Sequence, residues 1–371
     1  MKKKVLVVFG TRPEAIKMAP LVHHFKQRPL DFDLRVCITA QHREMLDQVL
    51  RFFDLEADYD LDIMKPNQGL VQLTARMLTE LEPVFNAFQP DYTFVHGDTT
   101  TTLVTSLAAF YAGSKICHVE AGLRTYDKSS PFPEEMNRQL TSRLTDFHFA
   151  PTREAKQNLL QEHIPDGQIF VTGNTVIDAL LQSLEKVKAN PGTFIESFSK
   201  KLGDRDVILV TGHRRENHGD GFLRICEALK EIALRNPDVQ LVYPVHLNPN
   251  VQKPVFELLQ DIANVFLIDP LDYPDFIWMM DRSKLIITDS GGVQEEAPSL
   301  GKPVLVMRNT TERPEAVEAG TVKLVGTDQA VIIRETEKLL SDADYYRQMS
   351  LAHNPYGDGK ACERIIQVIS D

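Results

Sequence analysis

Cysteine is scarce in this chain, and its few cysteines do not form a recognisable site. The 371 residues include four cysteines, which are scattered and show no CxxC spacing. Three of them lie within apolar segments, so we interpret them as small core residues in a reducing compartment. No HExxH motif or Cys/His cluster has the spacing of a zinc site, and the sequence predicts no metal.

Long apolar runs are also absent. The N-terminal segment MKKKVLVVFG joins lysines to an apolar run of about five residues, whereas the apolar region of a secretory leader needs roughly 7–15. No other stretch approaches the roughly 18 apolar residues of a membrane span. We therefore expect a soluble, cytoplasmic protein with no membrane partner.

Positive charge is in the minority. Lys and Arg number 41 against 52 Asp and Glu, and the formal net charge is −11. Because nucleic-acid binding needs a basic face, we expect no nucleic-acid partner. A small anionic ligand is not excluded, since a few local arginines and backbone amides suffice to bind one.

Several common fingerprints of nucleotide and hydrolase sites are missing. No GxGxxG follows an expected strand, so a nicotinamide fingerprint is absent. Gly301-Lys302 is followed by Pro303 rather than Ser or Thr, which excludes a P-loop there. A G-x-S-x-G nucleophile elbow is absent as well.

Short apolar runs rich in Val and Ile alternate with helical patterns through almost the whole chain. Continuous runs of this length, separated by helices, are typical of parallel strands buried on both faces. The expected strands are Val5–Phe9, Leu34–Thr39, Tyr92–His96, Lys115–Val119, Phe147–Ala150, Val207–Thr211, Val239–Tyr243, Val265–Asp269, Leu285–Asp289 and Val304–Met307. Two successive βαβ series predict an α/β fold of two Rossmann-like, doubly wound parallel-sheet domains.

Length and local composition suggest where the domains divide. A chain of 371 residues suits two domains, at roughly 150 residues per domain. We expect an N-terminal domain of residues 1–172 plus 355–371 and a C-terminal domain of residues 173–354. The least regular stretch is 189–204. The breaker-rich segment 353–359 precedes a last helix from Lys360, which we expect to return to the first domain.

Polar residues follow the expected strands at their carboxyl ends, where ligands bind in open α/β sheets. The first domain offers GTRPE at 10–14, HGDT at 96–99 and EAGLR at 120–124; the second offers GHRRE at 212–216 and DSGG at 289–292. For any single member, a helix cap or a satisfied loop polar group is the commoner explanation. Our hypothesis is that the two domains face each other across a cleft and bring these residues into one site.

The sharpest local pattern is KLIITDSGGVQEEAPSLGKPVLVM at 284–307. A strand ends at Asp289, the backbone turns through Ser290, Gly291 and Gly292, and a helix follows. Glycines allow close backbone approach, and exposed amides at a helix start favour a phosphate. Glu296 lies one turn beyond Gly292, where its carboxylate can accept hydrogen bonds from ribose hydroxyls. A glycine-rich turn with a solvent-facing glutamate is the ordinary alternative.

These segments resemble the non-hydrolysing UDP-N-acetylglucosamine 2-epimerases, bacterial enzymes related to two-Rossmann-domain (GT-B) glycosyltransferases. The similarity covers essentially the whole chain in family order: FGTRPEAIKMAP, TAQHREMLDQVL, HGDTTTT, HVEAGLRT, PFPEEMNR, TGNTVIDAL, TGHRREN, YPVHLNPNV, TDSGGVQEEAPSLGKPVLVMR and TTERPEAVEAGT. A series of that length is specific, whereas a single piece such as SGG is not. The resemblance implies a GT-B-like fold, no cofactor, a homodimer and a supply of N-acetylmannosamine units for bacterial surface polysaccharide.

The resemblance also implies roles for individual residues. The family's catalytic carboxylates correspond to Asp98, Glu120 and Glu134, with Arg138 close by and His213 near the phosphate next to the sugar. Leu271 departs from the pattern, which has Gln on the uracil side. The implied substrate contacts are Arg12, Lys17, Asp98, Glu120, His213, Leu271, Phe276, Ser290, Gly291, Gly292, Glu296 and Arg313.

Inversion at carbon 2 of an N-acetylhexosamine needs a special route, because no carbonyl is adjacent and the proton is weakly acidic. Transient oxidation by a nicotinamide is one route, and the sequence offers no site for it. The other is loss of UDP from carbon 1 as carbon 2 loses its proton, followed by re-addition to the 2-acetamidoglucal. That route needs a stabilised diphosphate and acid–base groups on two faces of the ring. Crowded carboxylates raise one another's pKa, which suits proton delivery near neutrality; which of the three takes the proton stays open.

Other functions fit parts of the same pattern. A GT-B glycosyltransferase shares the diphosphate and ribose contacts but needs an acceptor groove. A hydrolysing epimerase releases free N-acetylmannosamine and UDP, and a sugar-nucleotide sensor binds without turnover. Incubation with UDP-N-acetylglucosamine in heavy water separates these, because epimerisation introduces deuterium at carbon 2 of a product that retains UDP.

Overall fold

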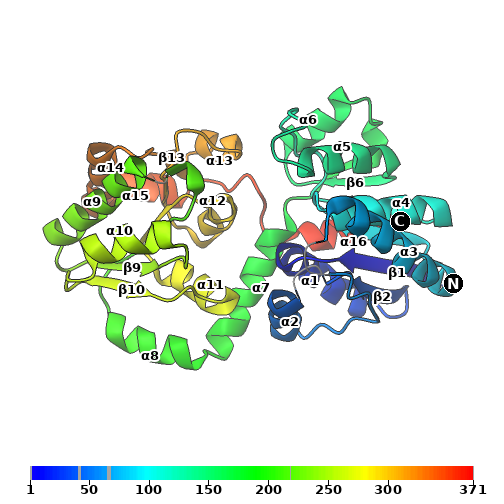
Figure 1. The fold of residues 1–371 in the computed structure, drawn as a ribbon, viewed down its shortest axis with the longest axis horizontal. Coiled ribbons are helices and arrows are strands. Elements are labelled where there is room, and N and C mark those ends of the chain that lie inside the picture. Colours follow the sequence, from blue (N-terminus) through cyan, green and yellow to red (C-terminus); the bar gives the residue numbers. More distant parts are fainter. Residues whose placement is uncertain (1, 41–42, 65–67, 218, 371) are drawn as a thin grey trace. The chain divides into compact units, whose positions relative to one another are not determined.

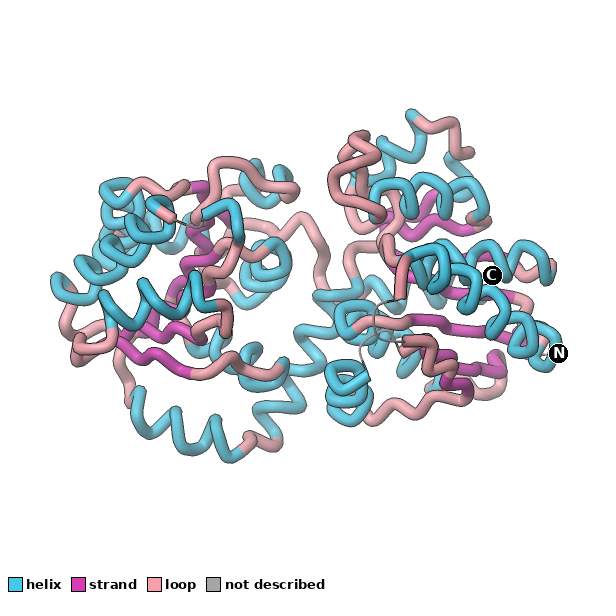
Figure 2. Tube along the Cα trace, viewed as in Figure 1, coloured by secondary structure: helices cyan, strands magenta, loops and turns pink. Residues whose placement is uncertain are grey.

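The computed structural model describes residues 2–40, 43–64, 68–217 and 219–370 and divides the chain into two compact units. Unit 1 comprises Met1–Ala179 and Tyr356–Asp371, and unit 2 comprises Leu180–Pro355. Figures 1 and 2 show that each unit is a sheet with helices packed around it. Within the described ranges, no helix is both long and apolar enough to cross a membrane.

The sheet of unit 1 is parallel, with strand order β3-β2-β1-β4-β5-β6-β7. Its strands are β1 (Lys3–Phe9), β2 (Phe32–Ile38), β3 (Tyr59–Asp60), β4 (Tyr92–His96), β5 (Lys115–Val119), β6 (Phe147–Ala150) and β7 (Ile169–Val171). The order reverses between β1 and β4, so the loops that leave these strands diverge. Ligands bind at such a switch point, beyond the carboxyl ends of the strands.

Helices from both ends of the sequence cover the unit 1 sheet. They are α1 (Arg12–Lys26), α2 (Arg43–Phe52), α3 (Leu70–Phe88), α4 (Thr100–Ala112), α5 (Glu134–Leu144), α6 (Arg153–Gln161), the 3-10 turn η1 (Asp166–Gln168), the start of α7 (Thr175–Ala189) and α16 (Ala361–Ser370). The last helix, α16, packs against α1, as Figure 1 shows. It buries Cys362, Ile365, Ile366 and Ile369 in unit 1.

Unit 2 repeats the same architecture with strand order β10-β9-β8-β11-β12-β13, also parallel. The strands are β8 (Val207–Thr211), β9 (Gln240–Pro244), β10 (Val265–Ile268), β11 (Leu285–Thr288), β12 (Val304–Val306) and β13 (Val322–Leu324). The helices are α8 (Thr193–Leu202), η2 (Arg215–Asn217), α9 (Asp220–Arg235), α10 (Pro249–Leu259), α11 (Tyr273–Arg282), α12 (Gly291–Glu296), η3 (Ala297–Leu300), α13 (Pro314–Glu318), α14 (Gln329–Ser341) and α15 (Ala343–Ser350). Its switch point lies between β8 and β11.

The predicted fold class of two parallel α/β sheets is confirmed. Each of the ten predicted strands is present, with bounds within about two residues of the expected ones. The four cysteines are free and buried, as small core residues would be. The expectation of an irregular stretch at 189–204 is wrong, because most of it forms α8. That helix buries Ile195, Phe198 and Leu202, whose spacing is helical.

Candidate active site

The loops after β1, β4 and β5 bring six of the predicted site residues to the carboxyl end of the unit 1 sheet. Arg12 and Lys17 lie in the first two turns of α1, which follows β1. Asp98 follows β4, and Glu120 follows β5 directly. Glu134 and Arg138 lie on α5, the helix after the next loop. Parallel strands place their carboxyl ends on one edge of a sheet, which is why residues far apart in the sequence meet there.

Glu120 is held through one of its two carboxylate oxygens. Its backbone has φ of +63°, in the left-handed region that a side chain rarely adopts. Oε2 pairs with Nζ of Lys17, accepts a hydrogen bond from Nδ2 of Asn174 at 2.9 Å and lies 3.6 Å from Nε2 of His96. Oε1 makes no hydrogen bond to any residue that the structure describes. The carboxylate therefore keeps one oxygen open.

Cations decide the charge state of Glu120. Burial acts to raise its pKa, but the ammonium of Lys17 and then the ring of His96 lower it more strongly, and the pKa lies well below the ordinary value of 4.5. The side chain is 11% exposed and carries a negative charge at neutral pH. The expectation that crowded carboxylates raise one another's pKa is wrong for Glu120, because the ammonium of Lys17 lies against its carboxylate and lowers the pKa.

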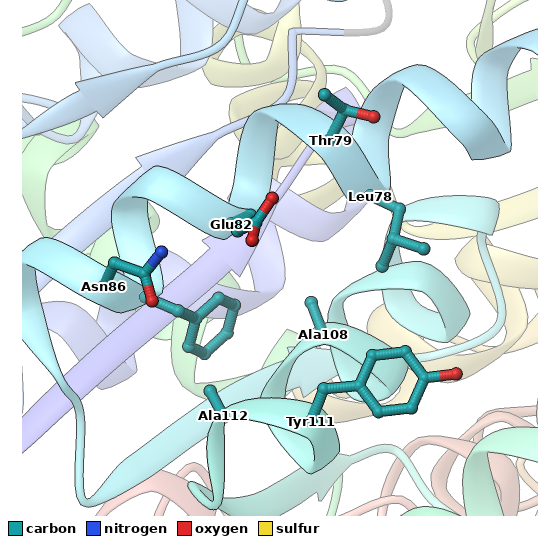
Figure 3. A pocket seen from close by; sticks show the side chains of 8 residues that line it. Leu78, Thr79, Glu82, Asn86, Ala108, Tyr111 and Ala112 are labelled. Carbon is teal, nitrogen blue, oxygen red and sulfur yellow. The ribbon is translucent and has the colours of Figure 1, made fainter.

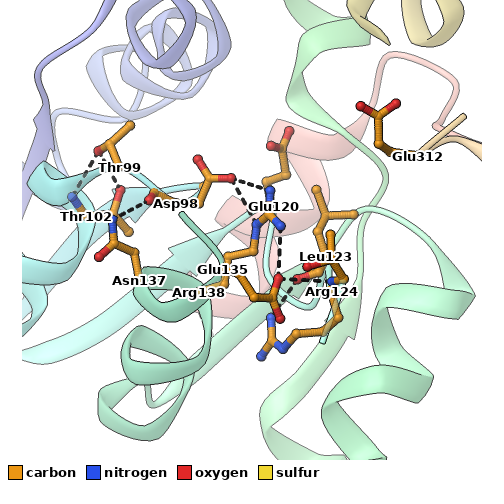
Figure 4. Close-up of polar contacts among 12 residues, drawn as sticks. Asp98, Thr99, Thr102, Glu120, Leu123, Arg124, Glu135, Asn137, Arg138 and Glu312 are labelled. Carbon is orange, nitrogen blue, oxygen red and sulfur yellow. Dashed lines mark hydrogen bonds and ion pairs between the residues drawn. The ribbon is translucent and has the colours of Figure 1, made fainter. Parts of the chain in front are cut away.

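Arg138 joins Asp98 to a second carboxylate, as Figure 4 shows. Its Nε and Nη2 donate to Oδ2 of Asp98 at 2.9 and 2.5 Å, and its Nη1 donates to Oε2 of Glu135 at 3.1 Å. Nδ2 of Asn137 donates to the carbonyl oxygen of Asp98 at 2.8 Å. Two side chains of α5 thus fix both the carboxylate and the backbone of Asp98.

Glu135, which the sequence analysis did not select, anchors the loop before α5. It is completely buried; its Oε1 accepts from Tyr126 N and Gln139 Nε2, and its Oε2 accepts from Thr125 N, at 2.8–3.1 Å. Burial acts to raise the pKa of Glu135, but these hydrogen bonds outweigh it and the pKa falls below its ordinary value. Its neighbour Glu134 is half-buried and makes no hydrogen bond or ion pair with the described part of the chain. Glu134 is therefore available to a ligand, and Glu135 is structural.

Glu14 is a second residue that the sequence analysis left without a role. It is 2% exposed and accepts hydrogen bonds from the amides of Gly10 and Thr11, at 3.1 and 2.7 Å, and from the hydroxyl of Thr99 at 2.6 Å. The β1–α1 loop is thereby tied to the start of α4, next to Asp98. The capping-box spacing of Thr11 and Glu14 is a signal that could have found this residue.

Arg12 differs from Lys17 because its side chain has no partner among the residues that the structure describes. It occupies the first position of α1, is half-buried and makes no hydrogen bond or ion pair among the described residues. A guanidinium at this position, beside the first amides of a helix, adds to the positive end of the helix dipole. Arg12 is therefore placed to meet an anion.

In unit 2, Asp289 organises the loop after β8. It is fully buried, and its Oδ2 accepts from the amides of His213 and Arg214 at 2.9 and 2.8 Å. Its Oδ1 lies 3.5 Å from Nδ1 of His213. The imidazole of His213 is 47% exposed and stacks on His246, with ring centroids 5.2 Å apart. Asp289 thus presents the ring of His213 next to the turn that begins α12.

Two guanidinium groups and one carboxylate surround the glycine turn. A Cβ built on Gly291 would lie 3.8 Å from Nη2 of Arg214 and from Cζ of Arg313. A Cβ built on Gly292 would lie 3.6 Å from Oε1 of Glu296, so this carboxylate does reach back over the turn. Cations beside an exposed glycine backbone are what a phosphate group needs. Arg214, part of the predicted polar segment 212–216 but given no individual role there, belongs to this group.

The remaining predicted residues of unit 2 lie on three segments. Ser290 precedes α12 as its N-cap residue and makes no side-chain capping bond. Arg313 forms an ion pair with the buried Glu295 of α12. Leu271 lies in the segment before α11 and Phe276 lies on α11, and both are half-buried. The helix α11 packs against η3, which follows α12 directly. Ser290 and Arg313 therefore belong to the group around the glycine turn, and the roles of Leu271 and Phe276 stay predictions.

Comparison with known proteins decides the family. The sequence model of the family described as UDP-N-acetylglucosamine 2-epimerase matches residues 23–370. The chain belongs to the UDP-N-acetylglucosamine 2-epimerase family. Relatives of that name from Campylobacter jejuni and Escherichia coli K12 are both 58% identical to it, over 376 and 371 residues. The alignments cover 100% and 99% of this chain and 98% of each epimerase.

Solved epimerase structures share the fold. The UDP-GlcNAc 2-epimerase of Neisseria meningitidis, bound to UDP-GlcNAc, is 53% identical with a TM-score of 0.86, and 99% of each chain is covered. The Methanocaldococcus jannaschii epimerase, in complex with UDP-GlcNAc and UDP, is 34% identical with a TM-score of 0.78, again over 99% of each chain. The family resemblance found in the sequence motifs is confirmed.

Proposed function

We propose that this chain interconverts UDP-N-acetylglucosamine and UDP-N-acetylmannosamine by inverting carbon 2 of the sugar. One observation carries the proposal: Glu120 is an ionised carboxylate with one oxygen held by Asn174 and Lys17 and the other open. A 58% identical relative is named for this epimerisation. We further propose that the protein works in the cytoplasm and supplies N-acetylmannosamine units for surface polysaccharide.

The proposed reaction is an elimination followed by an addition. A carboxylate takes the proton from carbon 2, a double bond forms between carbons 1 and 2, and UDP leaves carbon 1 with the electron pair of the broken C–O bond. A proton then returns to carbon 2 from the other face, and the diphosphate oxygen of UDP adds to carbon 1. Atoms and charge balance without an oxidant, and the same groups serve both directions.

The local geometry supports different roles for the three carboxylates. Glu120 is suited to accept the proton because its carboxylate is ionised at neutral pH and its Oε1 makes no hydrogen bond to the described residues. Glu134, which has no bond to the described part of the protein, is suited to carry the proton at the other face. Asp98 is clamped by Arg138 and is suited to orient the substrate rather than to move within the site.

The residues around Gly291 are suited to hold the nucleotide. Arg214 and Arg313 would neutralise the diphosphate, which stabilises UDP as a leaving group. Glu296 would accept the ribose hydroxyls. From the family resemblance we also assign Arg12, His213, Leu271, Phe276, Ser290 and Gly292 to substrate contacts.

We also propose a homodimer that forms through α3 and α4. A groove of about 380 Å³ is lined by residues of these two helices. Figure 3 shows Leu78 and Ala108 among its lining side chains. Tyr111 lines this groove and is 69% exposed, its neighbour Phe110 is 58% exposed, and Val71 in the first turn of α3 is 83% exposed, so both helices carry apolar surface that a partner subunit would cover. Sedimentation should give a dimer for the wild type and a monomer for Phe110→Asp; a monomeric wild type would refute this interface.

The experiment that tests the activity is incubation with UDP-N-acetylglucosamine in heavy water. We expect UDP-N-acetylmannosamine with deuterium at carbon 2. Product without label would refute proton exchange with solvent, and free N-acetylmannosamine would indicate a hydrolysing enzyme. Glu120→Gln should lower turnover by roughly 100-fold or more while UDP still binds. Loss of UDP binding with turnover intact would overturn the role of Glu120.

A further inference from the structure

Asn174 lies at the junction between β7 and α7, where hydrogen bonds hold both its backbone and its side chain. It is 3% exposed. Its backbone amide donates to the carbonyl oxygen of Tyr356 at 2.7 Å, and its Oδ1 accepts from the amide of Val176 at 3.0 Å, which caps the start of α7. Its Nδ2 donates to Oε2 of Glu120 at 2.9 Å. The Val176 amide is a donor, so the oxygen of the Asn174 side chain must face it, and the NH₂ group of Asn174 must therefore face Glu120.

The backbone around Asn174 leaves little room for it to shift. A Cβ built on Gly173 would lie 3.4 Å from both the Cα of Gly357 and the carbonyl oxygen of Tyr356, so these two segments touch through their backbones. Asp178, one turn into α7, accepts from the first amides of α16 at 3.2 and 2.9 Å. The donor that meets Glu120 is thus carried by a segment held on both sides within unit 1.

Lys17 and Asn174 act differently on Glu120. The ammonium of Lys17 sits on a flexible stem and acts as a point charge, which favours the ionised form without setting a direction. The amide of Asn174 has one fixed orientation and aims a single N–H at Oε2. A carboxylate bound in this direction turns its other oxygen, Oε1, away from Asn174.

We propose that Asn174 is a positioning residue of the epimerisation, which holds Glu120 so that Oε1 meets the proton at carbon 2. This inference rests on the proposed function of Glu120 and adds the group that orients it. Asn174 itself would not touch the substrate, and it would act only through the carboxylate.

Two substitutions separate this role from the capping of α7. Asn174→Asp has the same shape and keeps an oxygen for the Val176 amide, but it replaces the donor to Glu120 with a carboxylate oxygen. Asn174→Ser keeps a good N-cap residue and removes the donor without adding charge. The matched control is Thr152→Ala, which removes the 3.1 Å cap of α6 in the same unit.

The measurements are the pH dependence of kcat/KM, the affinity for UDP and thermal unfolding. For both Asn174 variants we expect kcat/KM at pH 7 to fall roughly 10- to 100-fold, the effect of losing one hydrogen bond to a charged group. For Asn174→Asp we also expect the acid limb of kcat/KM to move up by about one pH unit, because a like charge raises the pKa of Glu120. UDP affinity should stay within about twofold, and Thr152→Ala should lower Tm without changing either kinetic quantity.

A purely capping role predicts wild-type kcat/KM and an unmoved acid limb in both Asn174 variants, and that result would overturn the proposal. An equal loss of kcat/KM in Thr152→Ala would also overturn it. If Asn174→Asp does not fold, Asn174→Ser decides by the loss in kcat/KM. A wild type that introduces no deuterium refutes the proposed function itself, whereas normal labelling together with unaffected variants refutes only the role of Asn174.

Discussion

Replacing Glu135 by Gln tests whether this residue, rather than its neighbour Glu134, stabilises unit 1. The two carboxylate oxygens of Glu135 accept four hydrogen bonds in a fully buried position. A glutamine offers one acceptor oxygen in place of two, and its NH₂ group must face one pair of donors. The substitution preserves the volume of the side chain, so the effect reports on hydrogen bonding and charge.

The magnitude follows from which donors lose their acceptor. The amide oxygen should stay with Thr125 N and Arg138, because an NH₂ group in its place would face the guanidinium of Arg138 with donors on both sides. The NH₂ group then faces Tyr126 N and Gln139; Gln139 can reverse its own amide, but the amide of Tyr126 cannot. One buried donor without an acceptor, together with a weaker bond to Arg138, should cost roughly 2–4 kcal/mol. For a unit of this size, Tm should fall by roughly 4–16 °C.

Thermal unfolding of Glu135→Gln beside Glu134→Gln provides the test. The side chain of Glu134 makes no hydrogen bond or ion pair with the described residues, so its substitution should change the free energy of unfolding by less than about 0.5 kcal/mol. Turnover should show a loss of roughly 100-fold in Glu134→Gln, in which a proton carrier is removed. If Glu134→Gln lowers Tm and Glu135→Gln does not, the assignment of the two glutamates is wrong.

Two further outcomes can be checked on the same protein. Glu120 and Glu135 have pKa values below the ordinary 4.5. The stability that each ionised carboxylate contributes is therefore present at neutral pH and is lost as the pH falls below 4.5. When urea unfolding is measured between pH 3 and 7, Glu135→Gln should lose less stability toward acid pH than the wild type. Gly10→Ala places a Cβ 2.0 Å from Oγ1 of Thr39 and should lower the free energy of unfolding by about 1–3 kcal/mol. Adding Thr39→Ala should recover part of that loss. If the changes in the free energy of unfolding of the two single variants simply add in the double variant, the proposed clash between position 10 and Thr39 is wrong.

The strands were predictable because they are continuous apolar runs between helical segments. Those missed were β3, β7 and β13, which have two or three residues and lie at sheet edges, where short strands carry no apolar period. The helix α8 was missed because Pro191, Gly192 and Gly203 flank it and dominate the local composition. The helical spacing of its apolar residues could have indicated the helix, but the helix is only ten residues long.

The candidate site was accessible from the sequence only where a strand end or a family motif marks the residue. Asp98 and Glu120 follow strands, and the structure places them at the ends of β4 and β5. Asn174 and Glu135 matter through partners that no local pattern reveals; Asn174 meets Glu120 across 54 positions of sequence. Hydrogen bonds of this kind join residues that meet only once the strands have paired, so the local sequence pattern does not predict them.

The packing of α16 on α1 has a consequence for the order in which this polypeptide is made. Unit 2 is continuous from 180 to 355, whereas unit 1 needs the segment from 356 onward to cover α1. Domains fold as units during synthesis. During synthesis unit 1 therefore stays incomplete until the segment after residue 355 is available, and until then it exposes the apolar surface meant for Ile365 and Ile369. Nascent chains arrested just before residue 356 should accordingly depend on chaperones that shield this surface.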